Sequence, residues 1–163
     1  MCLVNHELRA NMEINEAKLI EREITLRDLR LTKEVVETRR SMVRWLALSL
    51  GIINPGESRL SAISVLDAML HFQFTKKEDP SVEELSNYIA AAWDPINEKT
   101  LRYHLLQLAN AGVLAHSKGK YYFICFGESE KYDIDAWVES YFESGIHPIK
   151  DKVSTVIKEL KGR

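Results

Sequence analysis

Hydrophobic side chains recur at helical spacing through the N-terminal third of the chain. The range 5–50 has no glycine or proline, and its apolar positions repeat every three, four or seven residues, as at Leu8, Met12, Leu19, Leu26 and Leu29. This pattern predicts one long helical region, which would reach about 70 Å if it were continuous. Asn15 and Arg22 interrupt the heptad register, so we expect a bent helix or a helical pair. Gly51 ends the region.

Three shorter helices follow in the middle of the chain. The range 61–74 is amphipathic, and a polar loop that ends at Pro80 separates it from the next helix. Ser81 and Glu84 have the spacing of a capping box, which marks the start of that helix. Asn97 is placed to cap a third helix, whose leucines follow three- and four-residue spacing.

Two short strands and further helices complete the pattern. Val113–Ala115 and Lys120–Phe126 flank a turn that contains Gly119, which predicts a tight β-hairpin. After the hairpin we expect one helix near Ile134–Glu143 and another that starts at Pro148. The expected fold class is therefore mainly α with a small β-hairpin.

The predicted elements divide the chain into three parts. Residues 1–56 form a long N-terminal helical region, residues 57–127 hold the three helices and the hairpin, and residues 128–163 form a C-terminal helical extension. No part is a block of like charge, and 22 Lys and Arg against 24 Asp and Glu give a net charge of −2. Any specific charged surface must therefore come from the arrangement of the charges.

The third helix and the start of the hairpin form the most specific segment. Lys99–Leu114 reads KTLRYHLLQLANAGVL, with Thr100 near the helix start and Ala111-Gly112-Val113-Leu114 leading into the first strand. This segment resembles the recognition helix and wing of ArsR-, MarR- and PadR-type regulators. The resemblance covers about residues 60–126. It implies a winged helix-turn-helix domain whose third helix enters the major groove of DNA.

The charge pattern of that segment agrees with a duplex-binding surface. Burial of its leucines turns the polar side of the third helix outward. Between residues 97 and 124 four basic residues stand against the single acid Glu98, and such a local excess suits phosphate contacts. Two of the predicted DNA-binding residues, Arg102 and Asn110, suit base edges. The full predicted set is Lys99, Thr100, Arg102, Tyr103, Asn110, Lys118 and Lys120.

Winged helices also serve as docking modules between proteins. Leu106 and Ala109 occupy positions where a DNA-reading helix commonly carries charge, and an exposed leucine suits a protein partner. We expect a winged-helix transcriptional regulator that binds double-stranded DNA as a dimer. The alternative is a winged-helix protein–protein adaptor in a larger transcription, replication or sorting assembly.

The terminal regions favour assembly. The apolar ridges of residues 5–50 and 153–160 lie outside the middle region, and soluble monomers avoid such bare patches. Pairing across a two-fold axis would bury them and present two recognition helices to major grooves about 34 Å apart. We expect a homodimer through the N-terminal and C-terminal helices, with the long N-terminal helix as the main contact. Alternatively, that helix folds back on its own domain.

Composition and motifs argue against several other classes of protein. With 45% hydrophobic residues the chain is typical of a folded protein, and no apolar run approaches the roughly 18 residues of a membrane span. We see no signal-peptide pattern, and the lone thiols Cys2 and Cys125 favour a reducing, cytoplasmic location. The sequence shows no phosphate-binding glycine loop, nucleophile elbow or metal-ligand spacing. We therefore expect no enzyme activity, no cofactor and no metal.

Overall fold

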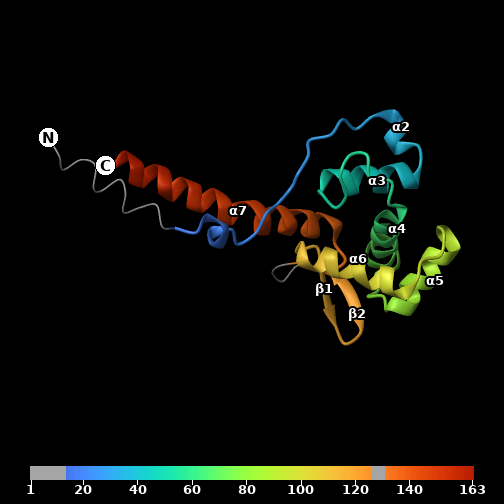
Figure 1. Cartoon of the computed structure of the whole chain (residues 1–163). Coiled ribbons are helices and arrows are strands. Elements are labelled where there is room, and N and C mark those ends of the chain that lie inside the picture. Colours follow the sequence, from blue (N-terminus) through green and yellow to red (C-terminus); the bar gives the residue numbers. More distant parts are fainter. Residues whose placement is uncertain (1–13, 126–130) are drawn as a thin grey trace.

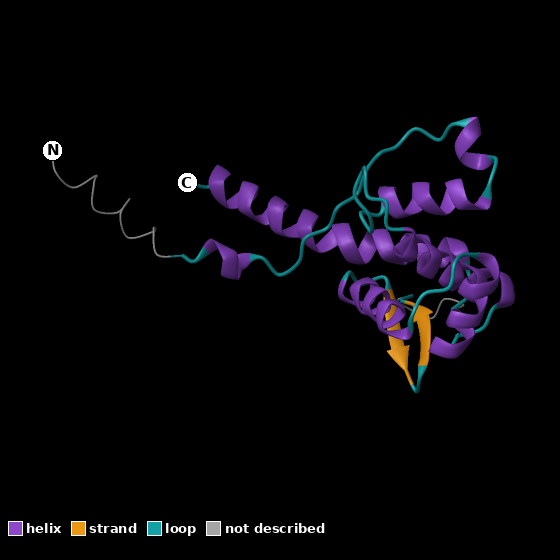
Figure 2. Cartoon of the chain, turned by 45° about the vertical axis from the view of Figure 1, so that its right-hand side comes forward, coloured by secondary structure: helices purple, strands orange, loops and turns teal. Residues whose placement is uncertain are grey.

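The computed structural model describes residues 14–125 and 131–163, which are mainly helical and contain one two-stranded antiparallel sheet (Figures 1 and 2). The hydrophobic pattern predicts this class of fold. In chain order the elements are η1 (Glu16–Leu19), α2 (Lys33–Val36), α3 (Arg39–Ser49), α4 (Leu60–Leu70), η2 (His71–Lys76), α5 (Val82–Ala92), α6 (Glu98–Asn110), β1 (Leu114–Ser117), β2 (Lys120–Phe123) and α7 (Ile134–Lys161).

Helix α4 is the centre of the core. Every residue from Ala62 to Met69 is buried, and α3, α5, α6 and β2 all pack against this helix. A helix that is buried on all sides needs neighbours all round it, and α4 has them. Helix α6 contributes Leu101, Leu105 and Leu108, and α7 contributes Trp137, whose ring packs against the Phe123 ring at 5.0 Å between centroids.

The predicted helix caps are confirmed. The Ser81 hydroxyl accepts a hydrogen bond from the Glu84 backbone N–H at 3.2 Å, and the Asn97 side chain accepts one from the Thr100 N–H at 2.8 Å. Each cap satisfies a backbone donor that the first helical turn leaves unpaired. These local bonds fix where α5 and α6 begin.

A buried carboxylate joins α3, α4 and α5. Asp67 is 2% exposed and accepts hydrogen bonds from Arg39 Nε at 2.6 Å, Tyr88 Oη at 2.9 Å and Trp93 Nε1 at 2.9 Å. A buried charge is tolerated when it is paired and hydrogen-bonded in this way. The guanidinium of Arg40 lies 4.3 Å from the centroid of the Trp93 ring. The turn between α5 and α6 is thereby held against α3.

The hairpin has the predicted tight turn. Leu114 pairs with Phe123 at the end of the hairpin away from the turn, and Ser117 pairs with Lys120 beside the turn. Lys118 and Gly119 both have positive φ, 52° and 75°, as a two-residue turn of type I′ requires. The first strand begins one residue and ends two residues later than predicted, and the second begins at Lys120 as predicted and ends three residues earlier. Phe126 lies outside the described residues.

The prediction of a long N-terminal helix is wrong over residues 20–32, which we call the N-terminal strap. The strap has no helix, and its hydrogen bonds go to other segments. The Arg27 N–H donates to Ser49 O, and its guanidinium donates to Leu48 O and Ile53 O at 2.8 and 3.0 Å. These carbonyls lie at and beyond the C-terminus of α3, where helical partners are missing. Residues 5–13 of the predicted helix lie outside the described residues.

The strap also requires a glycine beneath it. Gly51 has φ +67°, and a Cβ atom at this position would lie 2.7 Å from the Cβ of Thr25. Only a residue without a side chain combines that backbone conformation with so close an approach. Gly51 therefore ends α3, as predicted, and also gives the strap its path.

The prediction of two C-terminal helices is also wrong, because α7 runs without a break through Pro148. A proline inside a helix leaves the carbonyl four residues earlier without its N–H partner. Arg22 of the strap supplies the missing donor, with 2.7 Å from its Nη2 to Ser144 O. The first half of α7 packs on the core, and the second half extends away from it (Figure 1). No helix in the described ranges is both long and apolar enough to cross a membrane.

Candidate nucleic-acid interface

Helix α6 has an apolar face that packs on the core and a mainly polar face that is exposed to solvent. Leu101, Leu105 and Leu108 are buried together with His104, which is 8% exposed. The opposite face is exposed and consists of Lys99, Arg102, Tyr103, Leu106, Gln107 and Asn110, which we call the α6 outer face. All six are linked by three- or four-residue spacing, so they lie along one stripe of the helix. The N-terminal strap leaves this stripe open.

The predicted site residues fall into three groups. Lys99, Arg102, Tyr103 and Asn110 lie together on the α6 outer face. Thr100 is half-buried beside them, and its backbone N–H belongs to the Asn97 cap. Lys118 and Lys120 are exposed at the tip of the hairpin, which projects from the body of the protein (Figure 2). The surface is therefore composed of a helix face and a separate basic tip.

Two of the four basic residues are paired with acids. Arg102 Nε lies 2.7 Å from Glu98 Oε1 one turn earlier, and Lys120 Nζ lies 2.8 Å from Glu84 Oε1 on α5. The hydrogen bond from Lys120 lowers the pKa of the Glu84 carboxyl and keeps it charged. These pairs reduce the positive potential that the sequence predicts. Lys99 and Lys118 have no ion-pair partner among residues 14–125 and 131–163.

His104 holds the inner side of α6 in place. Its Nε2 lies 2.9 Å from the Ser61 hydroxyl at the start of α4. Burial lowers the pKa of His104, and the nearby charge of Arg59 lowers it further. The imidazole is therefore neutral at pH 7, and its function is to join α6 to α4. Together with the buried Leu101, Leu105 and Leu108, this contact sets which side of α6 faces the core and hence which residues face outward.

A polar groove of about 240 Å³ runs along one side of α6. It is lined by Arg59 and Glu57 before α4 and by Tyr103 and Gln107 on α6. Gln107 is not among the residues predicted from the sequence, although it lies one helical turn after Tyr103 and thus on the same face of α6. The groove extends the polar surface of α6 toward Arg59, which adds a basic residue at its edge.

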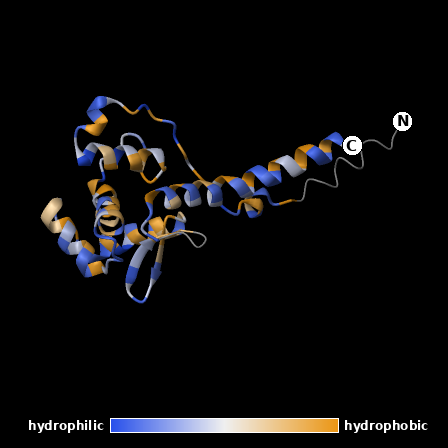
Figure 3. Cartoon of the chain, turned by 180° about the vertical axis from the view of Figure 1, so that it is seen from behind, coloured by the Kyte–Doolittle hydropathy of each residue, from blue (hydrophilic) through white to orange (hydrophobic). Residues whose placement is uncertain are grey.

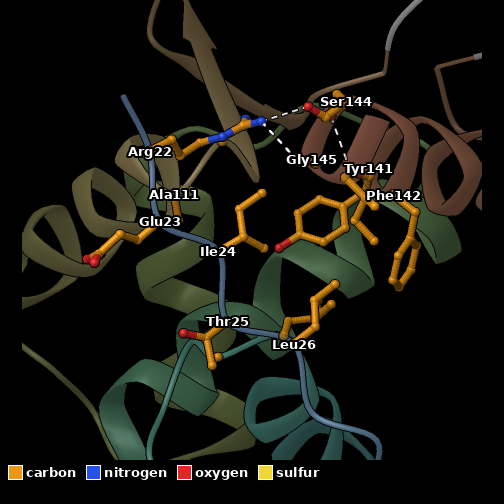
Figure 4. Close-up of a pocket in the computed structure, with 14 residues that line it drawn as sticks. Arg22, Glu23, Ile24, Thr25, Leu26, Ala111, Tyr141, Phe142, Ser144 and Gly145 are labelled. Carbon is orange, nitrogen blue, oxygen red and sulfur yellow. Dashed lines mark hydrogen bonds between the residues drawn. The ribbon is translucent and has the colours of Figure 1, made fainter. Parts of the chain in front are cut away.

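A second hollow, of about 130 Å³, lies where the strap crosses the end of α6 and the middle of α7 (Figure 4). Arg22 and Ile24 enter it from the strap and Tyr141 enters it from α7, and burial raises the pKa of the Tyr141 phenol. Sites for drug-sized ligands usually measure about 300–1,000 Å³. This hollow is a seam between packed segments. The described residues hold no cluster of three or more His, Cys, Asp or Glu that could bind a metal ion.

Comparison of the chain with protein-family models, curated proteins and solved structures finds no match. The geometry of α6 and the hairpin is therefore the basis for a proposed function.

Proposed function

We propose that this protein is a winged-helix regulator of transcription that binds double-stranded DNA, with α6 as its recognition helix and the β1–β2 hairpin as its wing. The order α4, α5, α6, β1, β2 supports this assignment, because it is the order of elements in such domains. The observation that carries the proposal is the division of α6. Its leucines and His104 face the core, and its polar outer face is open to solvent.

The outer face contains the groups that duplex recognition needs. Arg102 and Asn110 are side chains that reach base edges in a major groove, and Lys99 is an exposed cation for a phosphate. Arg102 uses only Nε in its contact with Glu98, so its terminal nitrogens remain donors for a guanine or a phosphate. Lys118 at the turn is the basic residue best placed to contact the backbone beside the groove.

The interior of the protein supports this surface. Asp67 fixes Trp93 and Tyr88, so the turn that leads into α6 is attached to the core. The Asn97 cap then sets the first turn of α6, and His104 joins the helix to α4. A rigid recognition helix loses little conformational entropy when it binds.

Titration of a fluorescent random duplex of about 30 base pairs tests the proposal. Affinity should fall steeply between 50 and 200 mM salt, because each neutralised phosphate contributes about −0.9 to the slope of log K against log salt. Lys99→Ala and Lys118→Ala should each weaken binding and reduce the slope by about 1. The matched control is Lys33→Ala, an exposed lysine on α2 at the opposite end of the molecule from the hairpin tip (Figure 1). Absent or salt-independent binding would contradict the proposal.

A second candidate function is docking to a protein. It is favoured by Leu106, which is 56% exposed in the middle of the outer face, and by the pairing of Arg102 with Glu98. The substitution Leu106→Lys separates the two functions because it adds a cation at the centre of the face. If a duplex lies there, its affinity and salt dependence increase. If the face is a protein-docking surface, neither the wild type nor the variant binds the duplex.

A further inference from the structure

The second half of α7 carries an apolar face that the described residues leave largely exposed. Its side chains are 42% to 67% exposed. We call this set the α7 distal stripe: Ile146, Ile149, Val153, Val156, Ile157 and Leu160. This half of the helix projects away from the core, and hydrophobic colour follows it toward the C-terminus (Figure 3). An aliphatic face of this size on a projecting helix marks an interaction site.

The spacing of the stripe identifies the kind of partner. Ile146, Ile149, Val153, Val156 and Leu160 alternate steps of three and four residues, which is the pattern of helices that pack side by side. Ile157 broadens the stripe on one side. A straight helical face of this kind is matched by another helix with the same repeat, and a second copy of α7 has that repeat.

The charge along α7 selects the direction of pairing. Residues 134–151 hold four acids and one lysine, whereas residues 152–163 hold four basic residues and one acid. Two parallel copies would place acidic beside acidic and basic beside basic. Two antiparallel copies place the acidic half of one helix beside the basic half of the other.

We propose that the α7 distal stripe is the contact surface of an antiparallel homodimer, with the two-fold axis near Val153. In this register Ile146 of one copy faces Leu160 of the other. Glu143 and Lys161 lie on the same flank of the helix, so Glu143 of each copy faces Lys161 of its partner. The dimer is thus closed and self-complementary, as a two-fold interface requires.

The start of the strap, together with Leu19 just before it, supports the same surface. Leu19 and Ile20 line a hollow beside α7 with Ile149 and Val153, so they widen the apolar surface near the proposed axis. Glu21 forms an ion pair with Lys152, which lies next to Val153. Two Lys152 side chains approach each other across the axis, and Glu21 of each copy reduces their repulsion. In the proposed dimer α7 therefore forms the main contact between the two copies, and the start of the strap adds apolar surface and a charge beside it.

Oligomeric mass tests the interface without DNA, so its outcome is independent of the proposed function. Sedimentation or light scattering of the full chain should give twice the 18.8 kDa of one chain over a hundred-fold range of concentration. Val153→Glu should give the single-chain mass with unchanged helical circular dichroism. The matched control, Thr155→Glu, lies on the opposite side of the same helix and should remain a dimer. A monomeric wild type, or a dimeric Val153→Glu variant, would overturn the proposal.

Cross-linking tests the direction. In a background with Cys2→Ser and Cys125→Ser, the single variants Ile146→Cys and Leu160→Cys are oxidised separately and then as a mixture. An antiparallel dimer gives a disulfide only in the mixture, because position 146 faces position 160 of the partner. A cross-link in either variant alone, or none in the mixture, would overturn the antiparallel arrangement.

Discussion

Arg22 donates a hydrogen bond of 2.7 Å to the carbonyl oxygen of Ser144, which is the acceptor that Pro148 leaves without an N–H donor. A second, longer contact of 3.5 Å reaches the carbonyl of Gly145 (Figure 4). The strap therefore replaces a bond that the helix cannot make for itself. This contact explains how α7 continues through a proline, and it ties the N-terminal strap to the C-terminal helix.

The first prediction is that Arg22 and Pro148 are energetically coupled. Arg22→Ala should lower the free energy of unfolding by about 1 kcal/mol, since a typical hydrogen bond contributes roughly that amount. Pro148→Ala should raise it, because the backbone bond to Ser144 returns and the ring clash with the preceding turn disappears. In the Pro148→Ala background the effect of Arg22→Ala should be smaller. Urea titration of all four proteins measures the coupling, and equal effects in both backgrounds would contradict it.

The second prediction concerns the buried carboxylate. Asp67→Ala should destabilise the protein by about 3–5 kcal/mol, because Arg39, Tyr88 and Trp93 all lose their acceptor. Glu98→Ala is the matched control, since it removes an exposed ion pair that contributes little to stability. Denaturant unfolding measures both variants. A loss below about 1 kcal/mol for Asp67→Ala would mean that the network does not stabilise the fold.

The third prediction applies to the interface. Glu98→Gln should strengthen binding to a random duplex roughly threefold to tenfold at low salt, because it removes a negative charge and releases Arg102. Glu57→Gln, on the rim of the groove beside α6, is the control for removal of an acid near the interface. If Glu98→Gln leaves the affinity unchanged while Lys99→Ala weakens it, the duplex contacts Lys99 and does not contact Arg102.

The parts of the fold that follow from neighbouring residues could be predicted, and those that depend on distant residues could not. The caps at Ser81 and Asn97 and the turn at Gly119 are set within three or four residues, and all three are confirmed. The strap has helical spacing, but Arg27 satisfies α3 carbonyls more than twenty residues away. From the sequence alone Pro148 predicts the start of a new helix. The Arg22 side chain that allows α7 to continue through it lies 122 residues before Ser144, so nothing near the proline indicates this contact.

In the candidate interface, too, contacts between neighbouring residues could be predicted from the sequence and contacts between distant residues could not. The outward direction of Lys99, Arg102, Tyr103 and Asn110 follows from the position of the leucines, and the structure has them exposed. The contact between Arg102 and Glu98 has the spacing of an ion pair on a helix and could have been anticipated. The contact between Lys120 and Glu84 spans 36 residues and depends on how the chain brings the hairpin beside the start of α5, where the Tyr121 N–H donates to Pro80 O.

The fourth prediction is that stability falls in mild acid. Burial lowers the pKa of His104 and of His71 below the ordinary value of 6.5, so the folded protein holds both imidazoles neutral where the unfolded chain already takes up protons. The unfolded state then binds more protons, and the free energy of unfolding decreases as the pH falls through about 6.5. His104→Gln and His71→Gln should each flatten this decrease. Urea titrations at several pH values between about 8 and 5 measure it, and an unchanged slope in the double variant would refute the assignment.

The fifth prediction compares two glycines with positive φ, one packed against the strap and one facing open space. Gly51 and Gly56 have φ of +67° and +83°, so alanine is strained at both positions. At Gly56 the added Cβ enters open space, and Gly56→Ala should cost about 1 kcal/mol, from the backbone alone. At Gly51 the Cβ would lie 2.7 Å from Thr25, so Gly51→Ala should cost clearly more and should displace the strap. Denaturation measures the difference in stability, and hydrogen exchange at the Arg27 amide, which bonds to Ser49 O, reports whether the strap has detached. Equal costs with full protection of the Arg27 amide would show that the strap is not held by its passage over Gly51.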